Sequence, residues 1–383
     1  MDLKMTDEQA LLLESVREFF ERNVTEEKVQ QWCKNRKLPD ELTKSYLDAG
    51  FGLLGIPEEY GGVSADKLTL VLLIEEVHHQ VGTRVPFILN GVNIFNLLEF
   101  GSPEQIKTCM DLYKKTGQHP FAMAISEVGA GSDNSAMLTT AKQVDGKIVI
   151  NGEKTWITDG EYTPYLLVFA KDEDSSPQNK SISAWLIPRD TPGVSTVSLE
   201  VISPTVMPIC KICLNNVVIG ESFRFGERGK GFINLMKNLE MERLLSCAVA
   251  LGLAQAAMDD AAVYANQRVQ FGQTIGSFQL IQEKLADMET KLQAARTFLY
   301  KTAWELENGK SVQLNSALLK RYMGQTATEI CSEALQIFGG LGFTTEARVG
   351  RLWQECRGIQ FQAGTDEIMV HIAGKQILKK YAK

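Results

Sequence analysis

The sequence predicts an α+β protein that is mostly helical: an N-terminal helical domain, a middle antiparallel β domain and a C-terminal four-helix bundle. All eleven prolines of the 383 residues lie at or before Pro208. Because a proline inside a helix costs about 3 kcal/mol, the proline-free remainder, rich in Ala, Leu, Gln and Glu, is expected to be helical. Ahead of it, short β-branched runs bounded by Gly, Pro, Asn and Asp are typical of strands. The expected domains are residues 1–118, 119–225 and 226–383.

Composition and charge narrow the classes of function. The formal net charge of −7 argues against a surface for nucleic acid or an anionic membrane. The start of the chain lacks a secretory signal pattern, and no uninterrupted apolar run reaches the roughly 18 residues of a membrane helix. The four histidines lack metal-ligand spacing, and Cys210 and Cys213, a lone CxxC among seven cysteines, are expected to be structural thiols. We therefore expect a cytoplasmic protein without a metal, a nucleic-acid partner or membrane insertion.

Helix starts are predicted in the first domain from capping residues. Thr6 and Gln9 have the spacing of a capping box, and Ser102 followed by Pro103 marks another start. Ser64 is expected to cap a long apolar helix that follows the turn PEEYGG, and a further helix is expected at residues 40–50.

Strands are expected in the middle domain at residues 148–150, 165–170, 181–187, 194–201 and 212–219. Asn151-Gly152 is a hairpin signal. Before it lies SEVGAGSD at residues 126–133, in which glycines let backbone N–H groups approach an anion and serines add donors. The segment fails as a dinucleotide-binding fingerprint and also fits an ordinary turn. Trp156 and Thr158, two apart on a strand, share one face, which suits either a flat heterocycle or a structural tryptophan.

Long helices are expected in the third domain at residues 235–272, 278–307, 312–338 and 366–381. The first carries Glu242 and Arg243, which alone would fit a solvated face, and Gly252, which would allow a neighbouring element to approach closely. Three glycines in QIFGGLGF exceed what a helix end needs. Thr365 or Asp366 is expected to cap the last helix.

Seven motifs in register carry a resemblance that covers essentially the whole chain. They are PEEYGG from Pro57, SEVGAGSD from Ser126, KTWIT from Lys154, MER from Met241, YANQRVQFGQTIGSFQLIQEKLADM from Tyr264, QIFGGLGF from Gln336 and AGTDEI from Ala363. In this order and spacing they resemble the flavin-dependent acyl-CoA dehydrogenase family. Residues 264–284 look especially similar to the bacterial crotonobetainyl-CoA reductase subgroup, whose members reduce an enoyl-CoA.

The resemblance implies FAD as cofactor, a CoA thioester as substrate, electron exchange with an electron-transferring flavoprotein, and a homotetramer. FAD contacts within a subunit are implied at Met123, Ile125, Ser126, Gly131, Ser132, Trp156, Ile157 and Thr158, with Thr365, Asp366 and Glu367 completing the site. Contacts to the FAD of a neighbouring subunit are implied at Arg268, Phe271, Gln279, Gln336, Ile337, Phe338, Gly339 and Gly340. Substrate contacts are implied at Ser132, Glu240, Arg243, Ala363 and Gly364.

The catalytic base is the main departure from the family. Ala363 stands where many members place their catalytic glutamate, and alanine cannot accept a proton. Glu242 occupies the position that other branches of the family use, and a carboxylate desolvated beneath substrate and flavin would have a raised pKa. Glu240 competes with it but lies about 200° away around the helix. A purely structural role for Glu242 remains the alternative.

Other functions remain compatible with the sequence. The implied activity is interconversion of an acyl-CoA and its 2,3-enoyl-CoA, in either direction. Loss of the usual base at Ala363 would also suit desulfination or oxygenation on the same flavin scaffold, and a non-catalytic acyl-CoA-binding protein is a third hypothesis. The resemblance implies that the helix around residues 83–93 forms the floor of the acyl pocket, where Asn90 and Asn93 fit either a short or polar acyl group or loop caps.

Overall fold

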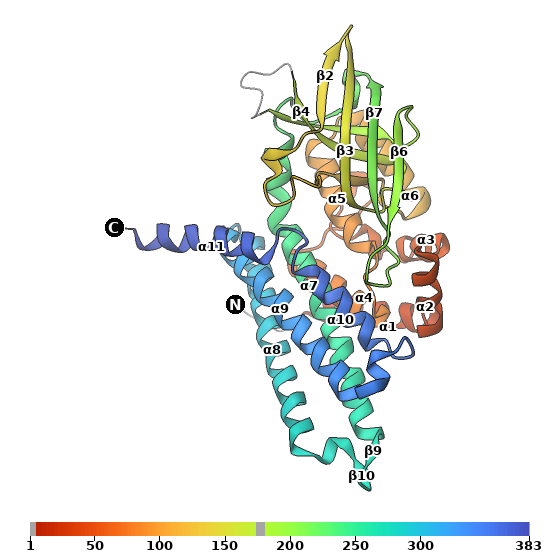
Figure 1. The fold of residues 1–383 in the computed structure, drawn as a ribbon, viewed down its shortest axis with the longest axis vertical. Coiled ribbons are helices and arrows are strands. Elements are labelled where there is room, and N and C mark those ends of the chain that lie inside the picture. The colour runs from red at the N-terminus through yellow and green to blue at the C-terminus, as the bar shows by residue number, and fades with distance from the viewer. Residues whose placement is uncertain (1–4, 174–180, 383) are drawn as a thin grey trace.

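The protein has a β-sheet domain at one end of an elongated body and a helical bundle at the other, with the N-terminal helices alongside both (Figure 1). This computed structural model describes residues 5–173 and 181–382. The predicted class, α+β and mostly helical, is confirmed.

Six helices form the N-terminal part. They are α1 (Asp7–Asn23), α2 (Glu26–Asn35), α3 (Asp40–Asp48), α4 (Lys67–Val81), α5 (Phe87–Phe100) and α6 (Pro103–Thr116). The capping boxes predicted at Thr6 and Ser102 are both present. The cap predicted at Ser64 is wrong: Asp66 accepts the Thr69 N–H at 2.6 Å, because the helix starts two residues later than its apolar pattern suggested.

The middle domain is one sheet with the strand order β6-β7-β3-β2-β4-β5-β8 and β1 beside β4. Its strands are β1 (Phe121–Ala124), β2 (Thr140–Val144), β3 (Lys147–Thr158), β4 (Tyr165–Asp172), β5 (Ile182–Pro188), β6 (Val194–Leu199), β7 (Ile209–Ile219) and β8 (Arg224–Phe225). Most pairs are antiparallel, as predicted, but β1 and β2 both pair with β4 in parallel. The inward side chains form a core that includes Ile150, Trp185 and Ile212.

The hairpin predicted at Asn151-Gly152 is wrong. The β2–β3 turn is Asp145-Gly146, with φ of 48° and 75°, the two positive values that a tight two-residue hairpin requires. Asn151 and Gly152 instead lie within β3, at a shift in its register against β7. Both dipeptides carry the turn signal, and pairing with the distant strand β7 decides between them.

The C-terminal domain is built around α7 (Gly231–Gln267), with α8 (Gln279–Glu307), α9 (Gln313–Phe338), α10 (Val349–Ile359) and the projecting helix α11 (Asp366–Tyr381) (Figure 1). The prediction missed α10 and extended the first helix too far. The helix ends at Gln267 because Arg268 is extended and β9 (Val269–Gln270) pairs with β10 (Gln273–Thr274) through a turn at Phe271-Gly272. By length and composition α7 could cross a membrane, but its most apolar window is 72% buried inside the protein.

Gly252 brings α7 against α4, as its position predicted. A Cβ added there would lie 2.2 Å from the Glu75 carbonyl oxygen, far inside van der Waals contact. The two backbones therefore touch at this point, which fixes the height of α7, and of Glu242 on it, relative to the N-terminal domain.

Candidate active site

The segment after β1 forms a turn that is fastened to strand β3. Ser126 accepts the Thr155 N–H at 2.9 Å, and Glu127 and Ala130 exchange two backbone hydrogen bonds. The Ser126 N–H makes no hydrogen bond within the described part of the chain. Gly131 and Ser132 are exposed, and a Cβ added at Gly131 would meet no atom within 4 Å. Open space and free donors thus lie at this turn.

A β-bulge in β3 turns the Trp156 ring outward. The register against β7 shifts between Lys154 and Ile157, and Trp156 has a φ of 58° with 55% of the residue exposed. Ile157 is buried in the sheet core, so only its backbone is available to a ligand. Because bulges re-aim side chains, the shared face predicted for Trp156 and Thr158 from a regular strand does not describe this segment.

Sequence reasoning missed a buried ion pair beside these residues. The Lys154 side chain is 0% exposed and lies 2.9 Å from Glu127. A lysine at an inward position of a strand was the available signal, because a lysine is almost never fully buried without a partner.

Glu242 is half-buried on α7 and has no hydrogen bond or ion pair with another residue that the structure describes. Burial raises the pKa of Glu242, and the neighbouring Arg243 guanidinium opposes that shift. The pKa of Glu240 is raised by burial as well, so both carboxylates are partly desolvated. Arg243 is buried, and its Nε has no partner among the described residues.

The loop before α11 carries Ala363 in a left-handed conformation, with a φ of 50°, followed by Gly364 at 95°. Thr365 caps α11, as predicted, by accepting the Ile368 N–H. Asp366 is buried and contacts Lys320 at 3.4 Å, so its carboxylate is engaged within the subunit, whereas Glu367 is exposed.

Buried Lys320 connects this loop with α7. Its Nζ donates to the Gln360 carbonyl at 3.0 Å, and its charge acts on Arg243.

The remaining predicted cofactor residues lie at the far end of the bundle. Phe271, at the tip of the β9–β10 turn, is 94% exposed, and Phe338 stacks on Tyr264 with ring centroids 4.2 Å apart. Gln279, Gln336, Gly339 and Gly340 are exposed there, whereas Ile337 is buried. Figure 1 places β9 and β10, at this end, opposite the β domain, so the turn between them lies far from strand β3 within one subunit.

A small cavity lies between the N-terminal helices and α7. Its lining includes Leu70, Phe87, Phe95 and Leu245, and is largely apolar. Asn93 is not part of the lining; it lies inside α5 and donates to the Phe121 carbonyl at 2.7 Å. Neither of the two alternatives predicted for it, a contact to a polar acyl group or a loop cap, describes this position. The side chain of Asn90 lies outside the described residues.

Known proteins share this three-part architecture. Family models described as the N-terminal, middle and C-terminal domains of acyl-CoA dehydrogenase match residues 6–111, 122–217 and 229–378. Together they span helices, sheet and bundle in the observed order. The chain belongs to the acyl-CoA dehydrogenase family.

Particular relatives cover its full length. The probable acyl-CoA dehydrogenase YdiO of Escherichia coli is 42% identical over 100% of this chain and 99% of its own. An acyl-CoA dehydrogenase from Slackia heliotrinireducens is 36% identical (TM-score 0.89, 100% of this chain and 99% of that one). Butyryl-CoA dehydrogenase from Megasphaera elsdenii is 30% identical (TM-score 0.90, 99% and 100%). A chain in a structure described as the electron-transferring flavoprotein of Acidaminococcus fermentans is 29% identical (TM-score 0.90, 99% and 100%).

Proposed function

We propose that this protein is an FAD-dependent enzyme that interconverts an acyl-CoA and its 2,3-enoyl-CoA, with Glu242 as the base. The observation that carries the proposal is the Glu242 carboxylate: half-buried and without a described partner, in a family member that has alanine at residue 363. An acyl-CoA dehydrogenase needs a proton acceptor beneath the substrate, and this carboxylate is desolvated as such an acceptor should be.

The residues around the turn after β1 fit FAD. Ser126 offers an unused N–H, Trp156 an exposed ring, and Gly131 open space for close approach of a ligand. These are the donors and the flat surface that an isoalloxazine ring needs. When bound, FAD would supply the acceptor for the hydride lost from the substrate β-carbon.

The chain itself would handle the proton and the thioester carbonyl. Glu242 would take the α-proton of the acyl group, a proton made more acidic if the carbonyl is polarised by a hydrogen-bond donor. The Ala363 N–H, which makes no hydrogen bond with another described residue, is the donor available on the opposite loop. The backbone N–H of Ala363 would therefore polarise the carbonyl, although the alanine side chain cannot accept a proton.

The cavity favours an apolar acyl chain. Leu245, which lines it, follows Glu242 by three residues and therefore lies on nearly the same face of α7. An acyl group whose α-carbon lies at Glu242 could extend toward Gly91 and Phe95 on α5. The butyryl-CoA dehydrogenase similarity agrees with a short apolar substrate, whereas crotonobetainyl-CoA would bring a cation into this space.

Partner, direction and assembly are further parts of the proposal. The similarity to a chain from an electron-transferring flavoprotein structure supports that class of electron partner. The β9–β10 turn lies at the end of the bundle opposite the β domain (Figure 1), which supports cofactor sites shared between subunits. We propose that the assembly is a homotetramer in the cytoplasm. The likeness of residues 264–284 to enoyl-CoA reductases supports reduction as the physiological direction.

The test is the visible spectrum of the purified protein under anaerobic conditions, with a panel of CoA thioesters. We expect bound FAD whose absorption is bleached by a saturated short-chain acyl-CoA and restored by the matching enoyl-CoA. The relative rates of the two reactions report the favoured direction. A colourless protein, or a flavin that no thioester reduces, would rule the proposal out.

A further inference from the structure

The turn proposed to meet FAD is held by the buried ion pair between Lys154 and Glu127. We propose that these are positioning residues, which fix the peptide between Ile125 and Ser126 so that the Ser126 N–H is presented to the cofactor. The inference rests on the proposed FAD site and adds to it a pair of residues that contact no reacting atom.

The Lys154 ammonium has all three of its donors engaged around this turn. Its Nζ donates to Glu127 Oε1 at 2.9 Å and to the Ile125 carbonyl at 3.0 Å, and lies 3.9 Å from the sulfur of Met137. Since an ammonium has three N–H donors, none is left for a ligand. Lys154 thus acts on its surroundings through the Ile125 carbonyl.

The geometry of the peptide bond carries this effect to Ser126. In a trans peptide the C=O and the following N–H point in opposite directions. Because the Ile125 carbonyl points at the buried ammonium, the Ser126 N–H points away from it. The Ser126 carbonyl is held too, by the Thr155 N–H at 2.9 Å, so the residue is oriented from both sides.

Glu127 keeps the ammonium in place. Its carboxylate accepts the Leu138 N–H at 2.5 Å and the Thr139 N–H at 3.0 Å in addition to Lys154. The two N–H donors tie the turn to the segment that leads into β2, and Lys154 ties it to β3. The residue lies directly after Ser126, so displacement of its side chain would displace the turn.

A contribution to folding stability alone does not explain why Lys154 and Glu127 are buried here. Replacing a buried ion pair by apolar groups of similar volume is often neutral or stabilising, because desolvation offsets the attraction. A hydrophobic pair would therefore fill this space equally well. A hydrophobic pair could not, however, hold the Ile125 carbonyl in one direction, because it has no hydrogen-bond donor.

The test compares FAD binding to apoproteins by titration, followed by flavin fluorescence and absorption. Lys154→Met alone leaves an unpaired buried carboxylate and is expected to lose stability. The informative variant is Lys154→Met with Glu127→Gln, which removes both charges and keeps the volumes. We expect its apoprotein to unfold at nearly the temperature of the unchanged one, but to bind FAD about tenfold more weakly, with a shifted flavin spectrum.

Lys211→Met is the matched control. It removes an ion pair with Glu153, one residue before Lys154 on the same strand, in which both side chains are partly exposed. We expect unchanged affinity and spectrum. If the double variant folds and binds FAD like the unchanged protein, the positioning role is wrong while the FAD site stands. If the unchanged protein binds no FAD, both the site and the positioning role are wrong.

Discussion

Ala363 is held in a conformation that an alanine seldom adopts, with a φ of 50°. A left-handed backbone conformation costs an L-residue about 1–2 kcal/mol. Other interactions of the loop must offset this cost for the Ala363 N–H to keep its direction. The backbone of Ala363 is therefore constrained although its side chain is only a methyl group.

Substitutions of Ala363 should distinguish the effect of its backbone conformation on stability from the effect of its side chain. We expect Ala363→Gly to leave the free energy of unfolding within about 1 kcal/mol of the unchanged value, because glycine accepts this φ. Ala363→Val should lower it by about 1–2 kcal/mol, since a β-branched side chain fits this region poorly. Urea unfolding measures both; equal stability of the two variants would show that the loop relaxes to another conformation.

At the scale of single residues, the sequence predicted those whose role follows from a local motif. The roles given to Glu242 and Arg243 came from the family resemblance and stay predictions, whereas the Thr365 cap was found in this way. The pairing of Lys154 with Glu127 was not, because the two residues lie 27 positions apart and meet only once β3 packs beside the turn. Likewise, the positive φ of Trp156 arises from a register shift against β7, which no local pattern reports.

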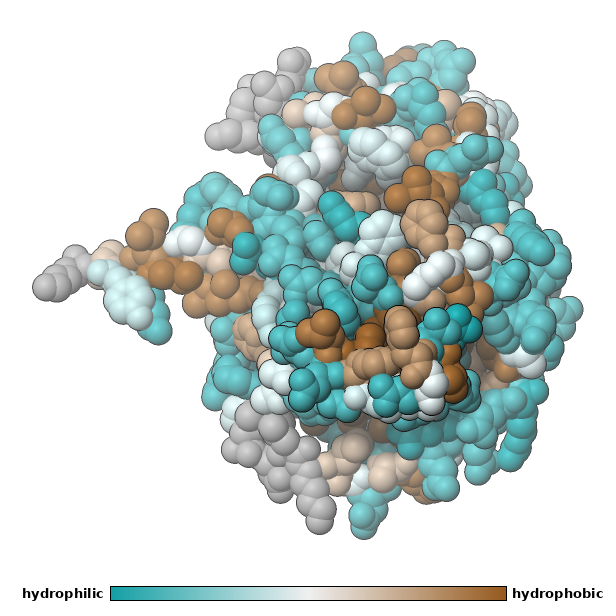
Figure 2. Space-filling view, turned by 60° about the horizontal axis from the view of Figure 1, so that its bottom comes forward, coloured by the Kyte–Doolittle hydropathy of each residue, from teal (hydrophilic) through white to brown (hydrophobic). Residues whose placement is uncertain are grey.

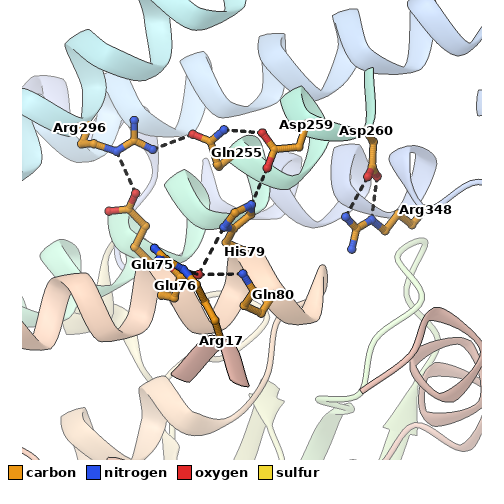
Figure 3. A network of polar contacts seen from close by, with 10 residues as sticks. All are labelled: Arg17, Glu75, Glu76, His79, Gln80, Gln255, Asp259, Asp260, Arg296 and Arg348. Carbon is orange, nitrogen blue, oxygen red and sulfur yellow. Dashed lines mark hydrogen bonds and ion pairs between the residues drawn. The ribbon is translucent and has the colours of Figure 1, made fainter. Parts of the chain in front are cut away.

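Helices α1, α4, α7 and α8 are joined by a network of charges (Figure 3). Glu76 accepts two hydrogen bonds from Arg17, and Glu75 pairs with Arg296 at 3.0 Å. His79 lies 2.7 Å from Asp259 on α7. Although burial alone would lower the pKa of His79, hydrogen bonds with Asp259 and Glu76 outweigh burial and raise it to about 9.

This histidine makes the α4–α7 contact dependent on pH. Because the folded pKa exceeds the ordinary value of 6.5, the stabilisation is complete below about pH 6.5 and is lost as the pH rises through about 9. We expect His79→Gln to lower the free energy of unfolding by an amount on the order of 2 kcal/mol at pH 6, and by much less above pH 9.

Urea unfolding at pH 6, 7.5 and 9.5 measures this difference. His371→Gln, at an exposed position on α11, is the control and should show no such trend. A constant difference between His79→Gln and the unchanged protein at all three pH values would mean that His79 is neutral in the folded state.

Substitution of Gly252 tests the close contact between α4 and α7. A Cβ there would meet the Glu75 carbonyl at 2.2 Å, whereas one at Gly374 on α11 would meet no atom within 4 Å. We expect Gly252→Ala to lower the free energy of unfolding by about 1–3 kcal/mol through overpacking. Gly374→Ala should raise it by up to about 1 kcal/mol through helix propensity. If both variants behave alike, α4 and α7 can move apart without cost.

At the scale of elements, helices with a clear apolar period and a capping residue were predicted to within a few residues. The predicted element boundaries were wrong where two local sequence signals conflicted and a tertiary contact determined which conformation formed. Asn151-Gly152 has a turn sequence but is kept extended by β7, and the apolar pattern of α7 runs past Gln267 although the chain turns at Phe271. The periodicity reports the buried face and not the end of the helix.

Across the whole molecule, exposed apolar side chains gather at the bundle end and along α11, as Figure 2 shows with that end turned forward. They include Phe271, Leu280, Phe343, Leu378 and Tyr381, each more than 70% exposed. Exposed apolar side chains that lie close together are typical of an interface between protein subunits.

We expect Phe271→Ser to leave the helical circular dichroism unchanged and to weaken FAD binding about tenfold, because the side chain would contact a partner's cofactor. Val144→Ser, on β2 in the opposite part of the molecule, is the control and should bind FAD normally. Sedimentation velocity gives the assembly state. A monomer of 42.6 kDa with full FAD occupancy would contradict the shared site.

The most direct test of the account is the rate at which a saturated acyl-CoA bleaches the bound flavin, measured by anaerobic stopped flow for Glu242→Gln. Glu240→Gln, two residues away with a carboxylate also partly desolvated, removes the competing base. Because Glu240 is also an implied substrate contact, both variants are compared at saturating acyl-CoA. We expect Glu242→Gln to keep its FAD and its unfolding temperature but to bleach about 10²- to 10⁴-fold more slowly, the usual contribution of a general base. Near-normal bleaching in Glu242→Gln, or a comparable loss in Glu240→Gln, would contradict Glu242 as the base.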